Sequence, residues 1–278
     1  MSRKRNNQMW RDQVQTQRFE RKYLVTESQA LVAREFIRAY LRPDVHGSAG
    51  PDGHSYPVHS LYLDSPDLLT YWAWVCCEKK RFKLRVRYYS ADPDAPLFFE
   101  IKRRVNECIL KQRALVRRSA LSALLAGQPP APEHLVGDGS ERLATLQIFC
   151  DVMRRIGAQP VVHVAYLREA WVSELGNSVR VTFDRFVSAE PKHVPELSMR
   201  MPSVVRPFGE NIVLEVKFTD RFPEWVRDIV QQLDLVACGV PKYCTCVGAL
   251  MGDKAGGCAP AGLKERLAEL GALWQETC

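Results

Sequence analysis

The chain has 278 residues, of which 46% are hydrophobic and 26% are charged, and its formal net charge is +7. This composition is that of an ordinary globular protein, and its longest nearly apolar run, 68–77, is about half of what a bilayer span needs, so we expect no transmembrane segment. The positive charge predicts an anionic partner, such as nucleic acid, anionic lipid or polyphosphate.

The basic N-terminus, MSRKRNNQMW, lacks the apolar segment of a secretory signal. Nine cysteines, an odd number that includes the adjacent pair Cys76 and Cys77, argue against a disulfide framework and favour a reducing compartment. We therefore expect a cytoplasmic protein. Cys244 and Cys246 form a C-x-C without a second pair at zinc spacing, so a metal role is the weaker interpretation of that pair.

Periodicity and turn residues predict eight strands, at 17–25, 58–64, 82–89, 97–103, 108–116, 161–173, 179–187 and 211–218. Helices are predicted at 27–41, 65–77, 223–235 and 243–251, with two more inside an insert at 118–157. The segment 42–57 is rich in turn residues and is predicted to be a loop. We expect an N-terminal extension at 1–16, one domain at 17–251 and a peripheral tail at 252–278.

The polar faces of these strands carry the same charge type repeatedly. Residues two apart share a face of a strand, and the shared faces hold Glu20 and Lys22; Lys83, Arg85 and Arg87; Glu100 and Lys102; Lys111 and Arg113; Arg180, Thr182 and Asp184; and Glu215 and Lys217. For any single strand, a solvated face is the simpler interpretation. The recurrence across the set, and the need of the helices for apolar strand faces to cover, favour an enclosed charged face.

We therefore expect an α+β fold, a closed antiparallel eight-stranded β-barrel tunnel with a charged interior and helices packed outside. Ile212, Leu214 and Val216 should face those helices. Buried cations without a counterion are too costly to keep, so the interior should bind a polyanion. Arg binds phosphate oxygens in pairs and Lys acts as a point charge, while inward Glu side chains could hold a divalent cation that bridges to phosphate.

Nine motifs carry a family resemblance: R-F-E-R-K-Y (18–23), S-L-Y-L-D-S (60–65), K-L-R-V-R-Y-Y (83–89), F-F-E-I-K-R-R (98–104), L-K-Q-R-A-L-V (110–116), A-Y-L-R-E-A (165–170), V-R-V-T-F-D-R (179–185), V-L-E-V-K-F (213–218) and P-K-Y-C (241–244). In this order, over about residues 17–250, they resemble the VTC (vacuolar transporter chaperone type) polyphosphate polymerase domain of the triphosphate tunnel metalloenzyme superfamily. A single Glu-x-Lys motif says little about the family of a protein, whereas nine motifs in this order are specific for one.

The resemblance implies a tunnel that binds triphosphate or polyphosphate together with Mn²⁺ or Mg²⁺. The implied catalytic residues are Arg85, Arg87, Lys102, Lys111, Arg168 and Arg180. Lys22 and Lys242 match substrate-binding residues, and strand parity adds Arg113 and Lys217 to that group. Glu215 matches the metal-holding carboxylate, and Glu20 is the second carboxylate predicted to bind the metal.

The sequence departs from the superfamily pattern at two positions. Hydrolase branches open with Glu-x-Glu-x-Lys, and this chain has Arg18 in place of the first carboxylate. The loss of that carboxylate favours the VTC branch over a two-metal triphosphatase. Pro241 stands where the family usually has Ser before the Lys of its C-terminal motif, which puts the local hydrogen bonding there in doubt.

The leading hypothesis is a polymerase that transfers the γ-phosphoryl of ATP to a growing polyphosphate chain. A non-catalytic module that binds polyphosphate or an inositol pyrophosphate is the alternative, and an inward carboxylate such as Glu215 favours the enzyme. Triphosphate hydrolysis is third, and nucleic-acid binding is last, because standard nucleic-acid motifs are lacking. A membrane-protein partner that receives the product is compatible with the sequence.

Tripolyphosphate should raise the melting temperature, since an anion that fills the charged interior relieves repulsion between cations and stabilises by mass action. The increase should shrink as ionic strength rises, though less than at an open surface, because enclosed charges are poorly screened. A thermal-shift titration with tripolyphosphate at low and high salt measures both effects. A flat melting curve at low salt and millimolar tripolyphosphate would contradict the prediction.

Overall fold

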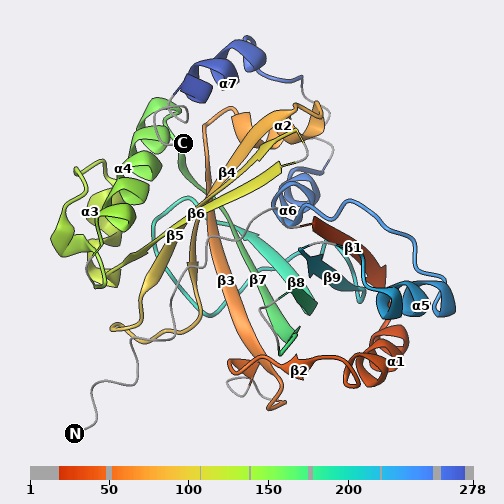
Figure 1. Cartoon of the computed structure of the whole chain (residues 1–278). Coiled ribbons are helices and arrows are strands. Elements are labelled where there is room, and N and C mark those ends of the chain that lie inside the picture. The colour runs from red at the N-terminus through yellow and green to blue at the C-terminus, as the bar shows by residue number, and fades with distance from the viewer. Residues whose placement is uncertain are drawn as a thin grey trace, which may run out of the picture.

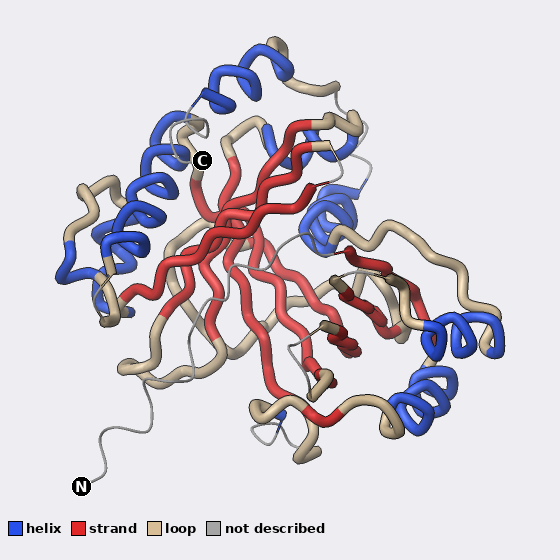
Figure 2. The backbone as a smooth tube through the Cα atoms, viewed as in Figure 1, coloured by secondary structure: helices blue, strands red, loops and turns tan. Residues whose placement is uncertain are grey.

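The computed structural model describes residues 19–47, 52–106, 108–137, 139–174, 178–219, 221–252 and 258–272. One large antiparallel sheet forms the centre of the fold, with helices around it (Figure 1; Figure 2). Its strands, in the order in which they pair, are β1 (Phe19–Val25), β9 (Ile212–Phe218), β8 (Val179–Pro191), β7 (Gln159–Val172), β3 (Ser55–Asp64), β4 (Lys80–Tyr88), β5 (Leu97–Val105) and β6 (Cys108–Val116). These correspond to the eight predicted strands. A further short strand, β2 (Arg42–Pro43), lies in the predicted loop and pairs with β7.

The helices follow the predicted order; α1, α2 and α5 are shorter than predicted, and α6 begins one residue earlier than predicted. They are α1 (Glu27–Ile37), α2 (Leu69–Val75), α3 (Leu121–Leu125), α4 (Ser140–Arg155), α5 (Glu224–Gln232), α6 (Lys242–Met251) and α7 (Leu263–Ala272), with two 3₁₀ turns, η3 (Arg118–Ala120) and η4 (Pro132–His134). Helix α1 begins at a capping box in which Thr26 and Gln29 satisfy each other's backbone N–H. Helix α7 lies in the segment predicted to be peripheral, yet it buries Leu263, Leu267 and Leu270 in the main core.

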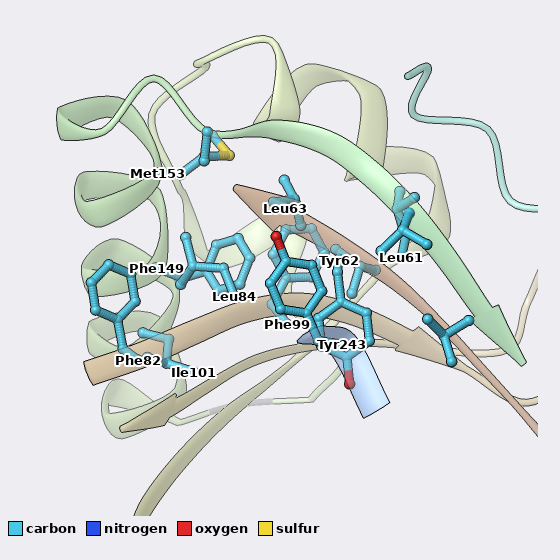
Figure 3. Close-up of a cluster of buried hydrophobic side chains, with 14 of the residues drawn as sticks. Leu61, Tyr62, Leu63, Phe82, Leu84, Phe99, Ile101, Phe149, Met153 and Tyr243 are labelled. Carbon is cyan, nitrogen blue, oxygen red and sulfur yellow. The ribbon is translucent and has the colours of Figure 1, made fainter. Parts of the chain in front are cut away.

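Apolar strand residues on the outer face of the sheet, defined here as the face that carries helices α1, α4 and α5, form most of two apolar cores, and the larger core also includes Tyr62 and Tyr166 of the opposite face. In the larger core, Phe149 of α4 meets Phe99 of β5 with ring centroids 4.9 Å apart (Figure 3). In the smaller core, α1 and α5 cover β1, β8 and β9. Ile212, Leu214 and Val216 belong to this smaller core, which confirms the predicted outward parity of β9.

The predicted closure of the barrel is wrong, because the sheet is open. Strands β1 and β6 end the sheet order and do not pair with each other in the described part of the chain. Each free edge is met by a loop instead: the Cys238 N–H donates to the Lys22 carbonyl at 2.9 Å, and the Val136 N–H donates to the Leu115 carbonyl at 2.9 Å. Loop backbone thus takes up hydrogen-bonding groups that barrel closure would have used.

The open sheet still curls until its distant parts meet. Lys102 Nζ of β5 lies 3.6 Å from Glu20 Oε2 of β1, although five strands separate β1 from β5 in the sheet order. The face that carries these two side chains, called the inner face here, is therefore concave. Curvature brings its charged side chains together without a closed ring of strands. Among the described residues, no helix has the length and apolarity to span a bilayer.

A buried ion cluster attaches α1 to the outer face. Glu169 of β7 is 1% exposed and accepts from Arg34 of α1 at 2.8 and 2.6 Å and from Arg185 of β8 at 2.7 Å. The Trp171 indole N–H also donates to Glu169, at 2.7 Å. These contacts outweigh desolvation and lower the pKa of Glu169. Every oxygen of this buried carboxylate thus has a charged partner.

Replacement of Glu169 by Gln should lower the free energy of unfolding by about 3 kcal/mol, since Arg34 would lose its carboxylate partner and the buried Arg185 would keep only Glu27. Urea unfolding followed by circular dichroism measures the loss. Glu35→Gln is the matched control, because Glu35 pairs with Arg38 on the exposed side of α1 and should change stability by about 1 kcal/mol at most. Equal effects of the two substitutions would contradict the buried role of Glu169.

Candidate functional site

The inner face gathers the basic side chains that the sequence analysis singled out. Strand pairing gives them one common face, and ion pairs or hydrogen bonds to other inner-face groups connect them. They are Lys22 of β1, Arg85 and Arg87 of β4, Lys102 of β5, Lys111 and Arg113 of β6, Arg168 of β7, Arg180 of β8, Lys217 of β9 and Lys242 of α6. Arg18, the residue that departs from the hydrolase motif, lies outside the described residues.

Glu100 is the centre of one charge group on this face. Its side chain is fully buried, and its carboxylate accepts from Arg85 Nε at 2.6 Å and from Arg113 Nε at 2.8 Å. Lys111 Nζ lies 2.8 Å from the same carboxylate, and Arg87 Nε lies 3.9 Å from it. Four basic side chains thus surround one carboxylate, which leaves a local excess of positive charge.

A second charge group contains three carboxylates. Glu20 pairs with Lys22 at 2.6 Å, and Glu215 pairs with Lys217 at 2.5 Å. Asp184 accepts two hydrogen bonds from Arg168, at 2.7 and 2.8 Å, and pairs with Lys242 at 2.7 Å.

Lys102 connects the two groups along β5. It lies on the same face as Glu100, two residues away, and its amino group reaches Glu20. The inner face therefore forms one connected network in which positive charge prevails.

Hydroxyl groups from β3 and β7 hold the guanidinium groups from the side. Arg85 donates to the Tyr62 hydroxyl at 3.1 Å, and Arg87 donates to the Tyr166 hydroxyl at 3.2 Å. Tyr166 also lies beneath Arg168, whose guanidinium carbon is 5.2 Å from the ring centroid. These aromatic and hydroxyl contacts fix the direction of the cations.

Sequence reasoning missed several members of this site. Glu100 and Asp184 lie on charged strand faces, and their alternation with basic residues was a usable signal for a charge-balancing role. Lys83 was grouped with the inner face but not with the site; its Nζ lies 5.3 Å from the ring centroid of Tyr243 on α6. Asp44 lies in a predicted surface loop, yet it pairs with Arg180 at 2.7 Å, and nothing in its sequence context indicates this contact.

Helix α6 is attached to the site by a buried hydrogen bond. The Tyr243 hydroxyl donates to Asp64 Oδ2 at 2.6 Å, and Asp64 is completely buried at the end of β3. The preceding residue, Lys242, thereby reaches Asp184 on β8. Pro241 precedes the helix and provides no side-chain cap, but its carbonyl accepts from the Thr245 N–H at 3.0 Å. The presence of Pro241 where the family usually has Ser therefore does not remove Lys242 from the site.

The pKa values on the inner face reflect burial opposed by neighbouring charge. Desolvation lowers the pKa of Lys111 to about 7, with Glu100 opposing it and the nearby guanidinium groups adding to it. Desolvation also lowers the pKa of Lys102 to about 8, against the attraction of Glu20. For Glu20, desolvation and Glu215 raise the pKa, but Lys102, Lys217 and Lys22 outweigh them and lower it to about 2. The carboxylates are therefore ionised at neutral pH, while these two lysines titrate near it.

The second charge group contains two carboxylates, Glu20 and Glu215, that are suitable ligands for a divalent cation. Glu20 and Glu215 face each other diagonally across the β1–β9 pair and repel each other electrostatically. Among the described residues, no group of three or more His, Cys, Asp or Glu side chains could hold a metal ion. Two carboxylates nevertheless fit Mg²⁺ or Mn²⁺ when phosphate and water oxygens fill the remaining positions.

The arrangement therefore suits a chain of phosphates. Guanidinium and ammonium groups from seven strands and one helix face one concave surface, where they could contact successive phosphate oxygens. Enclosed, preorganised cations of this kind can also stabilise charge that develops during phosphoryl transfer.

Comparison with solved structures finds low-identity similarities. A candidate adenylate cyclase from Bacillus halodurans has 13% identity and a TM-score of 0.45, covering 80% of this chain and 91% of that chain. A candidate adenylyl cyclase from Hippeastrum, described as having a dominant triphosphatase activity, has 12% identity and a TM-score of 0.46, covering 84% and 96%. The triphosphatase of the Mimivirus capping enzyme has 8% identity and a TM-score of 0.31, covering 77% and 88%. No curated protein sequence matches the chain significantly.

At the level of sequence families, the VTC domain profile matches residues 17–251. The match spans all the strands of the sheet and ends with α6, so it includes every inner-face residue described above. The chain belongs to the VTC domain family, a phosphate-handling enzyme family.

Proposed function

We propose that the chain is a nucleotide-dependent polyphosphate polymerase. The observation that carries the proposal is the connected inner face, on which basic side chains from strands β1, β4, β5, β6, β7, β8 and β9 outnumber the carboxylates between them. A linear polyanion with regularly spaced charge fits such a surface better than a single compact anion. Membership of a phosphate-handling family supports the same substrate class.

The proposed reaction needs few protein groups. A terminal phosphate oxygen of the acceptor chain attacks the γ-phosphorus of ATP, the bond between that phosphorus and the β–γ bridging oxygen breaks, and ADP leaves. Arg85, Arg87 and Arg168 would bind the equatorial oxygens on which charge is spread, and Lys102 and Lys111 would neutralise the chain. The attacking oxygen is already anionic, so the reaction requires no general base.

Glu215 and Glu20 would hold a divalent cation such as Mn²⁺ or Mg²⁺ in this reaction. When bound, the cation would neutralise phosphate charge between these carboxylates and the substrate. Glu215 must then share its carboxylate between Lys217 and the cation. The diagonal placement of the two glutamates supports this role.

A binding module without turnover is the alternative that one observation favours. The inner-face carboxylates Glu20, Glu100, Asp184 and Glu215 each pair with a basic side chain. Carboxylates in such pairs balance charge whether or not a reaction occurs. The same surface could therefore bind polyphosphate or an inositol pyrophosphate and leave it unchanged.

Purified protein incubated with ATP and Mn²⁺ should produce a polyphosphate ladder on a gel. Glu215→Gln should reduce the rate by roughly 10²–10³-fold, because the cation neutralises charge that develops during transfer. Binding of metal-free tripolyphosphate should persist in that variant. Equal rates for Glu215→Gln and the wild-type protein would refute the metal role, and tight binding with no turnover under any divalent ion would favour the binding module.

Arg87→Ala is the comparison variant, and it should weaken binding and turnover together. Its guanidinium would contact phosphate in both the ground state and the transition state, so its loss should affect both measurements. Isothermal titration with tripolyphosphate and the ladder assay, performed on the same preparation, separate the two patterns. A variant that binds tripolyphosphate normally would remove Arg87 from the substrate contacts.

Phosphate binding should take up protons near neutral pH. Lys111 has a pKa of about 7 without ligand, and an adjacent phosphate would raise it, so affinity should fall as pH rises above 7, by up to roughly tenfold per pH unit. Titrations in buffers with different ionisation enthalpies measure the uptake directly. In Lys111→Arg the side chain stays protonated, so this variant should take up fewer protons and its affinity should depend less on pH. The ionisation of tripolyphosphate itself is the same for both proteins. Identical pH profiles of affinity would therefore exclude Lys111 as the titrating group.

A further inference from the structure

Thr182 lies on the inner face at the centre of the second charge group. It is the middle residue of the set Arg180, Thr182 and Asp184 on β8, and its direct cross-strand partners are Glu215 on β9 and Ala170 on β7. Directly opposed residues of antiparallel strands have neighbouring side chains. Thr182 is 1% exposed, so its hydroxyl is enclosed at the position next to Glu215.

The Thr182 hydroxyl has no hydrogen-bond partner within the described part of the protein. The carboxylates around it do have partners: Asp184 is held by Arg168 and Lys242, and Glu215 by Lys217. A buried hydroxyl without a partner lowers stability, and valine has nearly the same shape without that cost. In the absence of a ligand, a methyl group in place of the hydroxyl would make the folded protein more stable. The hydroxyl therefore points to a ligand.

The charges around the hydroxyl indicate which ligand it meets. Glu215 is directly opposite, and Glu20 lies diagonally beyond it on β1. A divalent cation at this place would be attracted by both carboxylates, whereas Lys22 and Lys217, which pair with them, would attract phosphate to the neighbouring part of the face. Hydroxyl and carboxylate oxygens are the hard donors that Mg²⁺ and Mn²⁺ prefer. Asp184 contributes less, because its oxygens are already occupied by Arg168 and Lys242.

We propose that Thr182 Oγ1 is an oxygen ligand of a divalent cation held by Glu215, with Glu20 as the second carboxylate. The inference rests on the cation-binding role that the proposed function gives to Glu215, but it does not require turnover. It adds a neutral donor to a site in which sequence reasoning saw only carboxylates. Because a neutral donor adds no charge, it strengthens cation binding without further repulsion of phosphate.

The test uses Thr182→Val, which keeps the shape and removes the hydroxyl, and Thr182→Ser, which keeps the hydroxyl. Mn²⁺ binding is measured by the electron paramagnetic resonance signal of free Mn²⁺, with and without tripolyphosphate. Thr182→Val should bind Mn²⁺ roughly tenfold more weakly or worse, while its melting temperature without ligand should equal or exceed that of the wild-type protein. Thr182→Ser should bind Mn²⁺ close to the wild-type level.

The opposite signs of the two effects separate a ligand role from a structural one, since a structural hydroxyl would lower the melting temperature when removed. Thr145→Val is the matched control, because Thr145 is a buried threonine of α4 on the outer face; it should leave Mn²⁺ affinity unchanged. Thr182→Ala replaces the valine variant if that variant does not fold.

Three results would overturn the proposal: wild-type Mn²⁺ affinity in the valine variant, no Mn²⁺ binding by the wild-type protein even with tripolyphosphate, or a loss confined to tripolyphosphate binding in EDTA. The last result would assign the hydroxyl to phosphate instead. Failure of polyphosphate synthesis is seen separately in the ladder assay. Thr182-dependent Mn²⁺ binding without a ladder would preserve this inference and reject the polymerase.

Discussion

The buried carboxylate of Glu100 is the interaction on which the site depends. Arg85, Lys111 and Arg113 come from two different strands, and without an anion among them their mutual repulsion in a poorly solvated place would force the strands apart. The carboxylate offsets part of this charge and leaves an excess of positive charge that a bound phosphate chain would balance. The folded state is thus prepared for phosphate before phosphate arrives.

The balance between buried carboxylates and cations also explains why the inner face has two regions of different charge. Around Glu100, cations prevail and only phosphate oxygens are suitable partners. Around Glu20 and Glu215, two carboxylates repel each other among several lysines, so a divalent cation between these carboxylates and phosphate would relieve that repulsion. In the proposed reaction, the nucleotide and its cation would occupy the second region, and the acceptor phosphate chain would occupy the first.

Both regions are maintained by contacts outside them. On the outer face, Glu169 connects α1 to β7 and β8 through Arg34 and Arg185, behind the strand that carries Asp184 and Thr182, β8. At one side of the sheet, the bond between Tyr243 and Asp64 positions α6. These buried polar contacts set directions rather than supply most of the stability, which comes from the two apolar cores that the helices cover.

The sequence by itself determined the strands, their order along the chain and the parity that separates charged from apolar faces, because side chains alternate with a period of two residues whatever the strands pair with. It also pointed to most of the basic residues that the structure brings together on the inner face, including Lys22, Arg87 and Lys217. Only the tertiary structure decided that the sheet stays open. The free edges of β1 and β6 bond to loop backbone and do not pair with each other. The tertiary structure likewise decided that Asp44 reaches Arg180 and that Thr182 has no partner, because both depend on residues distant in sequence whose proximity no local pattern encodes.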